Sequence, residues 1–242
     1  MTRLSRRQAL AGMGSVSLGA LLAACGGDDD DTETRVETTD GTTSTVEPSG
    51  GRGDLARQFD DAATCTRTAE QTEGPFYFDV DSIRSDIRED RDGTPLRLGV
   101  RVREAEECRP LANAVVDVWH CDSHGVYSGF ESGANETFLR GAQVTDADGI
   151  VEFTTVYPGG YSGRTVHIHA KVHVDRQTVL TTQFYFDDAV SEKVSGSEPY
   201  ASNGDRDTSN EDDALFSSDL ELTLSRLSDG GGYLGLITLD VA

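Results

Sequence analysis

Apolar and polar residues alternate along much of the chain after residue 90. In residues 96–102, Leu96, Leu98 and Val100 occupy every second position, and Arg97 and Arg101 stand between apolar neighbours. Because successive side chains of a β-strand point to opposite faces, this alternation predicts a strand with one buried face. Similar patterns and short apolar runs predict further strands over residues 114–120, 143–145, 151–155, 165–174, 179–186, 221–227 and 233–241.

Turn residues separate these short strands, and helical signals are weak. The spacer Asp146-Ala147-Asp148-Gly149 suits a hairpin, since Asp and Gly tolerate the positive φ that such turns need. Only residues 80–88 and 188–194 suggest a helical turn. We therefore predict an all-β domain over residues 65–242. Its core would be a β-sandwich of mostly antiparallel strands with long loops and little helix.

The first 24 residues have the pattern of an export signal. Arg3, Arg6 and Arg7 precede a stretch of small apolar residues that is too short to span a membrane. Ser5-Arg6-Arg7 resembles a twin-arginine signal, and Leu22-Ala23-Ala24-Cys25 resembles the site at which a lipoprotein is cleaved and lipidated. An incidental arginine pair and an ordinary cysteine are the alternatives. We expect an exported lipoprotein, anchored through Cys25 to the outer face of the cell membrane.

Residues 25–64 are rich in Asp, Thr, Glu, Gly and Ser, with scattered apolar residues. Such a segment cannot bury enough apolar surface to offset the entropy lost on ordering. We predict a disordered acidic tether that holds the domain away from the membrane.

The charge of the chain excludes some partners. Its 43 acidic and 21 basic residues give a formal net charge of −22, which argues against binding to nucleic acid. No apolar run reaches the roughly 20 residues of a spanning helix, which leaves the lipid as the expected membrane contact. Lys171 and Lys193 are the only lysines. This suits a high-salt habitat, with an ordinary acidic exported protein as the alternative.

Three cysteines belong to the predicted domain: Cys65, Cys108 and Cys121. Export favours a disulfide, and three thiols allow three pairings with one left over. Cys108 and Cys121 flank one predicted strand, so we rank that pairing last. Pairing of Cys65 with either of the other two stays open.

Candidate chemistry is concentrated in residues 166–174. Alternation places His167, His169, Lys171 and His173 on one face of the predicted strand, opposite the apolar core face. Two histidines at i and i+2 can bind one metal ion, because imidazole is the commonest side-chain ligand. A solvated polar face with incidental histidines is the alternative.

The other donors narrow the choice of metal. Both methionines lie in the signal, which disfavours a blue-copper site. A three-histidine zinc site that includes His173 stays open, and a carboxylate that would complete a two-histidine iron site is not evident. Tyr127 and Tyr161 lie in turn-rich loops. Their phenolates would be hard anionic donors suited to Fe(III).

The sequence resembles the intradiol ring-cleavage dioxygenases, the family of catechol 1,2-dioxygenase and protocatechuate 3,4-dioxygenase. The similarity extends over most of residues 65–190, and the family fold is a β-sandwich. The motifs that carry it are Thr72-Glu73-Gly74-Pro75-Phe76-Tyr77, Asp117-Val118-Trp119, Gly125-Val126-Tyr127, Pro158-Gly159-Gly160-Tyr161, Arg164-Thr165-Val166-His167-Ile168-His169 and Thr182-Gln183-Phe184-Tyr185-Phe186.

The resemblance implies a non-haem Fe(III) centre. Its metal ligands would be Tyr127, Tyr161, His167 and His169. Tyr161 would leave the metal when substrate binds and accept a proton, and Arg164 would stabilise negative charge on the substrate ring. The residues that would line the substrate pocket are Thr72, Pro75, Phe76, Trp119, Gln183 and Tyr185.

The implied reaction cleaves a catechol-type ring between its two hydroxylated carbons, with dioxygen, to a cis,cis-muconate-type diacid. The alternative is an exported zinc- or copper-binding sandwich without oxygenase activity. His120 and His124 flank the Tyr127 loop, and we expect them beside the site or at the surface. Lys171 and His173 extend the polar face beyond the ligands, and we expect them at a solvated edge. Cys121 as an iron ligand is a minor alternative. The sequence leaves open the particular catechol and whether the chain forms a homodimer.

Overall fold

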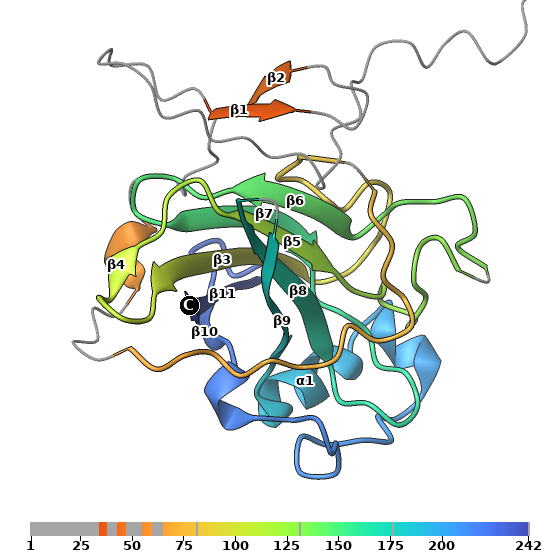
Figure 1. Cartoon of the computed structure of the whole chain (residues 1–242). Helices are drawn as coiled ribbons and strands as arrows, with labels where there is room; N and C mark the ends of the chain where they lie inside the picture. The colour runs from red at the N-terminus through yellow and green to blue at the C-terminus, as the bar shows by residue number, and fades with distance from the viewer. Residues whose placement is uncertain are drawn as a thin grey trace, which may run out of the picture.

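The structure is a computed structural model that describes residues 34–37, 43–46, 55–59, 65–80, 82–130, 132–175 and 177–241. Its main body is a sandwich of two β-sheets, with one α-helix among the described residues (Figure 1). The predicted all-β sandwich is thereby confirmed. β1 (Thr34–Glu37) and β2 (Thr43–Val46) form a separate antiparallel pair.

The first sheet is built around the long strand β3 (Pro95–Glu104). β11 (Tyr233–Val241) pairs with β3 in parallel, and β10 (Thr223–Arg226) pairs with β11. β3 also pairs antiparallel with β7 (Ile150–Val156) and with the short β4 (Arg109–Pro110). Among the described strands, β3 and β11 form the only parallel pair of strands, so mostly antiparallel pairing is confirmed.

The second sheet has four antiparallel strands in the order β6 (Arg140–Val144), β5 (Val115–Trp119), β8 (His167–Val174) and β9 (Gln177–Tyr185). The predicted strands match β3 and β5 to β11 to within three residues at either end. β4 was not predicted, since two residues carry no periodicity.

The hydrophobic core lies between the two sheets. β3 contributes Leu98 and Val100, and β8 contributes Ile168 and Val172, all fully buried. These are the positions that alternation assigned to the apolar face. The opposite face of the second sheet carries the polar residues of β8, and it is buried as well. Lys171 and His173, expected at a solvated edge, are both 9% exposed, so that expectation is wrong.

The cover over this second face comes from an extended segment near the start of the domain. The Gln71 N–H donates to the carbonyl oxygen of Thr181 on β9, at 2.8 Å. The Lys171 ammonium forms an ion pair with Glu73 and lies 3.7 Å from the centre of the Tyr77 ring. This covering segment has neither helical nor strand periodicity in its sequence. Its contacts bury the polar face of the second sheet.

Two predicted local features have different outcomes. α1 (Asp188–Ser195) forms where a helical turn was expected, and the side chain of Asp187 caps it by accepting from the Val190 N–H at 2.9 Å. Over residues 80–88, by contrast, the described residues are extended. Ile83 and Asp86 make isolated bridges to Ala142 and Thr154, so the expected turn there is wrong.

The packed structure begins earlier than residue 65. Leu55 and Phe59, which we had placed in the tether, are buried against Ile150, Leu234 and Leu236. The export signal and Cys25 lie outside the described residues, as does most of the predicted tether.

Cys65 and Cys108 form a disulfide with a Cα–Cα distance of 5.6 Å. This is one of the two pairings that the sequence left open. Cys121 is a buried free thiol. No helix among the described residues has the length and apolar character needed to cross a membrane.

Candidate active site

His167 and His169 project from β8 onto the covered face of the second sheet. Both are at most 2% exposed. The register places His169 between Trp119 on β5 and Gln183 on β9, and His167 opposite Tyr185. Regular alternation along β8 thus brings the predicted pair of ligands together.

The ring nitrogens of this pair have distinct roles. His167 Nδ1 lies 2.7 Å from the carbonyl oxygen of Thr165, which can only accept, so the proton of a neutral ring belongs on Nδ1. That leaves a lone pair on His167 Nε2, which lies 3.1 Å from His169 Nε2. Burial lowers the pKa of His167 to about 3 and the pKa of His169 well below its usual value. Two neutral imidazoles therefore present adjacent nitrogens to one place.

Tyr161 reaches this place from the loop before β8. Its hydroxyl oxygen lies 2.9 Å from His167 Nε2. Tyr127 comes from the loop after β5, and its ring centre is 5.8 Å from that of Tyr161 and 6.2 Å from that of His169. The structure therefore brings all four predicted ligands together.

The Tyr127 hydroxyl is buried and makes no hydrogen bond of good geometry to the described residues, although it is near enough to Tyr161 to affect its ionisation. Burial raises the pKa of both Tyr127 and Tyr161. Without a cation, both phenols stay protonated at neutral pH. An unpartnered buried phenol is costly and calls for a ligand.

Glycines allow the two tyrosine loops to approach each other. Gly125 has a φ of +80°, and a Cβ there would lie 2.7 Å from the carbonyl oxygen of Gly160. A Cβ on Gly159 would lie 2.5 Å from the carbonyl oxygen of Ser123. The Gly159 N–H also donates to the carbonyl oxygen of Asp122 at 3.0 Å. Contact of this closeness between backbones excludes any side chain at these positions.

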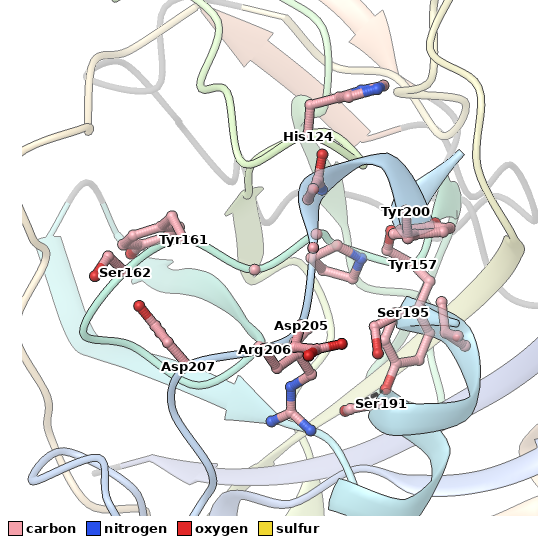
Figure 2. A pocket seen from close by; sticks show the side chains of 17 residues that line it. His124, Tyr157, Tyr161, Ser162, Ser191, Ser195, Tyr200, Asp205, Arg206 and Asp207 are labelled. Carbon is pink, nitrogen blue, oxygen red and sulfur yellow. Dashed lines mark hydrogen bonds between the residues drawn. The ribbon is translucent and has the colours of Figure 1, made fainter. Parts of the chain in front are cut away.

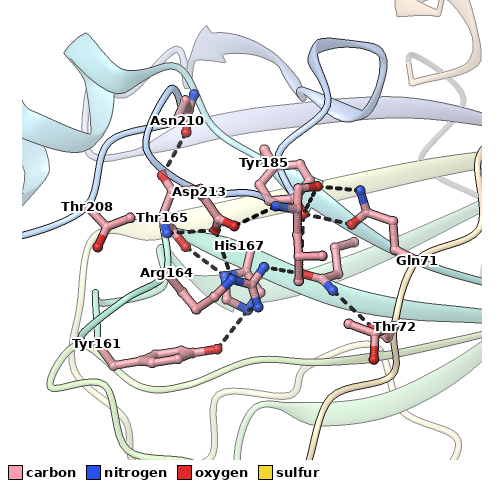
Figure 3. A network of polar contacts seen from close by, with 12 residues as sticks. Gln71, Thr72, Tyr161, Arg164, Thr165, His167, Tyr185, Thr208, Asn210 and Asp213 are labelled. Carbon is pink, nitrogen blue, oxygen red and sulfur yellow. Dashed lines mark hydrogen bonds and ion pairs between the residues drawn. The ribbon is translucent and has the colours of Figure 1, made fainter.

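Arg164 stands at the edge of the cluster, as the resemblance implied. Its Nη1 lies 3.5 Å from His167 Nε2, and its Nη2 donates to Gln183 Oε1 at 2.5 Å. The Gln183 amide donates in turn to the Thr72 carbonyl oxygen at 2.9 Å. The Tyr185 hydroxyl lies 3.4 Å from Gln183 Oε1 and so belongs to the same network (Figure 3).

The predicted pocket residues take different places. Phe76 stacks on Tyr127, with ring centres 4.4 Å apart, and its edge faces Tyr161 at 6.3 Å. Trp119 stacks on His169, with ring centres 5.0 Å apart and an angle of 7° between the planes. Thr72 contributes its carbonyl rather than its exposed side chain, and Pro75 is exposed in the adjacent turn. Phe76 and Trp119 are thus the predicted pocket residues that flank the ligand cluster most directly.

The remaining histidines do not join the cluster. His120 Nε2 contacts Thr155 Oγ1, and its Nδ1 contacts the Cys121 carbonyl oxygen, both at 2.8 Å. His124 is exposed. His173 stands four residues beyond His169 on the strand, about 13 Å along it at ordinary strand rise, and contacts Thr178 at 3.1 Å. A zinc site made of His167, His169 and His173 does not fit this geometry.

Acids and sulfur do not complete the site. Among the described residues, no group of three or more His, Cys, Asp and Glu side chains is arranged to hold a metal ion. The Cys121 thiol donates to the Gly159 carbonyl oxygen at 3.4 Å, and burial raises its pKa to about 12. The oxygen donors that the described residues bring beside the histidine pair are the phenols of Tyr127 and Tyr161.

A cavity of about 400 Å³ lies beside the loop that carries Tyr161 (Figure 2). Its walls include Tyr157, Ser191, Tyr200 and Arg206, and Tyr161 is the one candidate ligand that lines it. Tyr127, His167 and His169 do not border it. This cavity is therefore distinct from the cluster of candidate ligands.

Sequence reasoning missed Asp213. Its carboxylate accepts from Arg164 Nε at 2.8 Å, although it lies 49 residues further along the chain. No motif or periodicity marks Asp213, because the contact is made by a long irregular loop. Asp117 was noted only as part of a motif. It is buried two residues before Trp119 on the same face of β5, opposite Lys171 on β8 and close to Tyr77.

The two tyrosines and two histidines gathered on one covered face of the β-sandwich form a set of donors that could hold a metal ion. The family model described as "Dioxygenase" matches residues 72–195, just over half of the chain. Together with the similarities given next, this shows that the chain belongs to the intradiol ring-cleavage dioxygenase family.

Similar solved structures include the intradiol ring-cleavage dioxygenase from Tetranychus urticae. It is 32% identical, with 73% of this chain and 95% of that chain covered and a TM-score of 0.70. The dioxygenase domain of a dioxygenase–carbohydrate-binding protein fusion from Streptomyces sp. SirexAA-E is 34% identical. There, 73% of this chain and 100% of that chain are covered, with a TM-score of 0.56.

Curated relatives include catechol 1,2-dioxygenase 1 of Acinetobacter lwoffii. It is 36% identical over 142 residues, which cover 48% of this chain and 45% of that protein. A chlorocatechol 1,2-dioxygenase of Pseudomonas putida is 30% identical, with 50% and 54% covered. The chain spans about half the length of the curated relatives that it matches.

Proposed function

We propose that this protein is a non-haem Fe(III) dioxygenase that cleaves a catechol-type ring between its two hydroxylated carbons. Dioxygen would contribute both of its atoms, and the product would be a cis,cis-muconate-type diacid. One observation carries the proposal: the phenols of Tyr127 and Tyr161 meet the neutral imidazoles of His167 and His169. Membership of the dioxygenase family supports it.

The residues present fit a ferric ion. Phenolate oxygen is a hard anionic donor, and neutral imidazole nitrogen is a common ligand for iron. Tyr127, Tyr161, His167 and His169 would hold the ion. Bound Fe(III) would supply Lewis-acid activation of a chelated catecholate. The buried, unpartnered hydroxyl of Tyr127 would gain a partner when the ion binds.

Tyr161 has the surroundings of a proton acceptor. Burial raises its pKa, so a phenolate released into this place takes up a proton readily. A catechol must lose two hydroxyl protons to chelate a metal. Tyr161 would hold one of them at its phenolic oxygen, and the other would pass to solvent.

Arg164 would stabilise charge on the substrate. Its Nη1 points into the cluster, 3.5 Å from His167 Nε2. A fixed guanidinium at this place favours negative charge that develops on the ring during reaction with dioxygen. Phe76 and Trp119 supply aromatic walls for a flat ring and limit access of water.

The visible spectrum of the purified protein is the most direct test. Phenolate-to-Fe(III) charge transfer gives strong colour that zinc cannot give. We expect a coloured protein with one iron per chain, and one dioxygen consumed per catechol with formation of a muconate-type product. A colourless protein that contains one zinc per chain and takes up no oxygen would contradict the proposal. It would favour the alternative of a metal-binding module.

We also propose export of the protein as a lipoprotein anchored through Cys25. The order of arginines, apolar stretch and cysteine in residues 1–25 supports this, and the Cys65–Cys108 disulfide fits an oxidising compartment. Detergent partitioning tests it. The wild-type protein should enter the detergent phase and Cys25→Ala should stay in the aqueous phase. Equal partitioning of the two would contradict the lipid anchor.

A further inference from the structure

We propose that Asp213 is a positioning residue for the reaction, which acts by holding Arg164 in place. This inference rests on the proposed function of the Tyr–His cluster. Asp213 lies in the long loop between α1 and β10, beyond residues 72–195 that the family model matches. Neither the sequence motifs nor the family match assigns it a role.

The contact between the two side chains is close and sheltered from water. Asp213 Oδ2 accepts from Arg164 Nε at 2.8 Å, and the Asp213 side chain is only 2% exposed (Figure 3). The same oxygen accepts from the Thr165 N–H at 3.0 Å. Its partner oxygen, Oδ1, accepts from the Leu215 N–H at 2.9 Å. The carboxylate therefore ties the side chain of Arg164 to the backbone that leads into β8.

These bonds keep the carboxylate charged. Burial alone would raise the pKa of Asp213, but the Leu215 and Thr165 N–H groups and the Arg164 guanidinium outweigh it and lower the pKa below its usual value. A charged carboxylate and a guanidinium make hydrogen bonds that are stronger than those between neutral groups.

The loop that presents Asp213 is itself fixed. The Thr165 hydroxyl donates to Asn210 Oδ1 at 2.7 Å, and the Asn210 amide donates to the Phe186 carbonyl oxygen at 2.8 Å. Arg206 forms an ion pair with Asp188 at 2.8 Å. The support for Asp213 thus comes from the residue after β9, the first residue of α1 and the segment before β8, rather than from the loop alone.

The consequence is that Arg164 is held at two of its three nitrogens. Arg164 Nε donates to Asp213, and Arg164 Nη2 donates to Gln183. The remaining nitrogen, Nη1, faces His167 Nε2. A guanidinium is planar, so fixing two nitrogens fixes the direction of the third. Without these two contacts, rotation about the several side-chain bonds of Arg164 would be less restricted. The guanidinium would then face the substrate only part of the time.

The test compares Asp213→Asn with Asp212→Asn in the iron-loaded full-length protein. Both variants remove one carboxylate charge, but Asp212 is exposed and its side chain contacts Ser209, not Arg164. We expect Asp213→Asn to lower kcat for catechol about tenfold or more, as the loss of an orienting contact does. Binding of catechol without oxygen, followed by the visible spectrum, should change less than threefold. Asp212→Asn should match the wild type in both.

A double-mutant cycle separates positioning from general damage. If Asp213 acts through Arg164, then Asp213→Asn should have little further effect in an Arg164→Gln background. Asp213→Glu, which keeps the charge, should recover part of the lost turnover. Equal kcat for Asp213→Asn and the wild type would overturn the proposal, and so would fully additive losses in the cycle.

Two further measurements keep the outcome clear. Thermal unfolding of each variant shows whether the fold is retained. If Asp213→Asn does not fold, the test uses Asp213→Glu instead, alone and combined with Arg164→Gln in the same double-mutant cycle. If the wild type cleaves no catechol, the proposed function fails. Crystal structures of wild type and variant then show by themselves whether Arg164 keeps its place without the carboxylate, and an unmoved Arg164 would overturn the positioning role.

Discussion

The Nε2 atoms of His167 and His169 lie 3.1 Å apart, and the Thr165 carbonyl places the proton of His167 on Nδ1. Burial lowers the pKa of both rings, so both are neutral at neutral pH. A neutral His169 ring carries its proton either on Nε2, where it would donate to His167, or on Nδ1, where it would leave both Nε2 lone pairs free. In the second tautomer, the two Nε2 atoms can bind one metal ion together.

Loss of one histidine should greatly weaken metal binding. We expect His169→Ala to lower iron affinity by more than the roughly 10–100-fold that loss of a mere supporting contact costs. His173→Ala is the matched control, because His173 lies on the same strand face but contacts Thr178. Iron per chain, measured after dialysis, should drop sharply in the first variant and stay near one in the second. Equal iron in both would contradict the assigned ligand set.

Tyr161→Phe should change the visible spectrum and the turnover while the protein keeps its fold. The change removes one phenol oxygen, which lies 2.9 Å from His167 Nε2, and leaves the ring in place. We expect a shifted visible spectrum and turnover reduced by about 100-fold or more, in the range for a lost general base. Tyr157→Phe is a suitable control, since the Tyr157 hydroxyl contacts Ser191 away from the cluster. Unchanged spectrum and turnover in Tyr161→Phe would remove Tyr161 from the proposed mechanism.

The sequence predicted most of the sheets, because strand alternation is a local property that survives in β8 and β3. It also placed His167 and His169 on one face. Alternation does not tell whether a face is covered, and for that reason Lys171 and His173 were wrongly expected at a solvated edge. The segment that covers them runs extended along the sheet and has no periodicity of its own.

Local sequence patterns could not predict contacts between residues that are distant along the chain. Asp213 meets Arg164 through an irregular loop. The pairing of Cys65 with Cys108 depends on how the start of the domain packs against the turn between β3 and β4. The tyrosine ligands were assigned through resemblance to a family, since nothing about a single Tyr in a turn identifies a ligand. The glycines that bring the two tyrosine loops together became interpretable only with the backbone in view.

Gly125→Ala should damage the site through a steric clash. Its Cβ would lie 2.7 Å from the Gly160 carbonyl oxygen, and its φ of +80° is strained for any side chain. Gly163→Ala has the same conformational strain, at +81°, with no atom within 4 Å of the added Cβ. We expect about 1–2 kcal/mol of destabilisation from the strain in both variants.

The clash should add about 1–3 kcal/mol in Gly125→Ala alone and lower its iron content. Urea unfolding and iron analysis of both variants measure the difference. Equal stability and equal iron in the two variants would show that the approach of the tyrosine loops is not tightly constrained.

Asp117 should make stability depend on pH. Burial, and then the charge of Asp79, raise the pKa of Asp117 to about 7, against opposing effects of Tyr77, Arg140 and Lys171. A carboxyl whose pKa is raised on folding binds its proton more tightly in the folded state. Its stabilising contribution is therefore complete below about pH 4, the unfolded value, and is lost as pH rises through about 7.

Asp117→Asn should remove this dependence, because an amide keeps the shape of the protonated acid and does not ionise. The wild type should lose up to about 4 kcal/mol relative to this variant between pH 4 and pH 8, at about 1.4 kcal/mol per pKa unit. Urea unfolding of both proteins at several pH values gives the difference directly. A difference that stays constant, or that grows in favour of the wild type as pH rises, would mean that Asp117 is ionised in the folded protein. The Lys171 and Arg140 charges would then outweigh its burial.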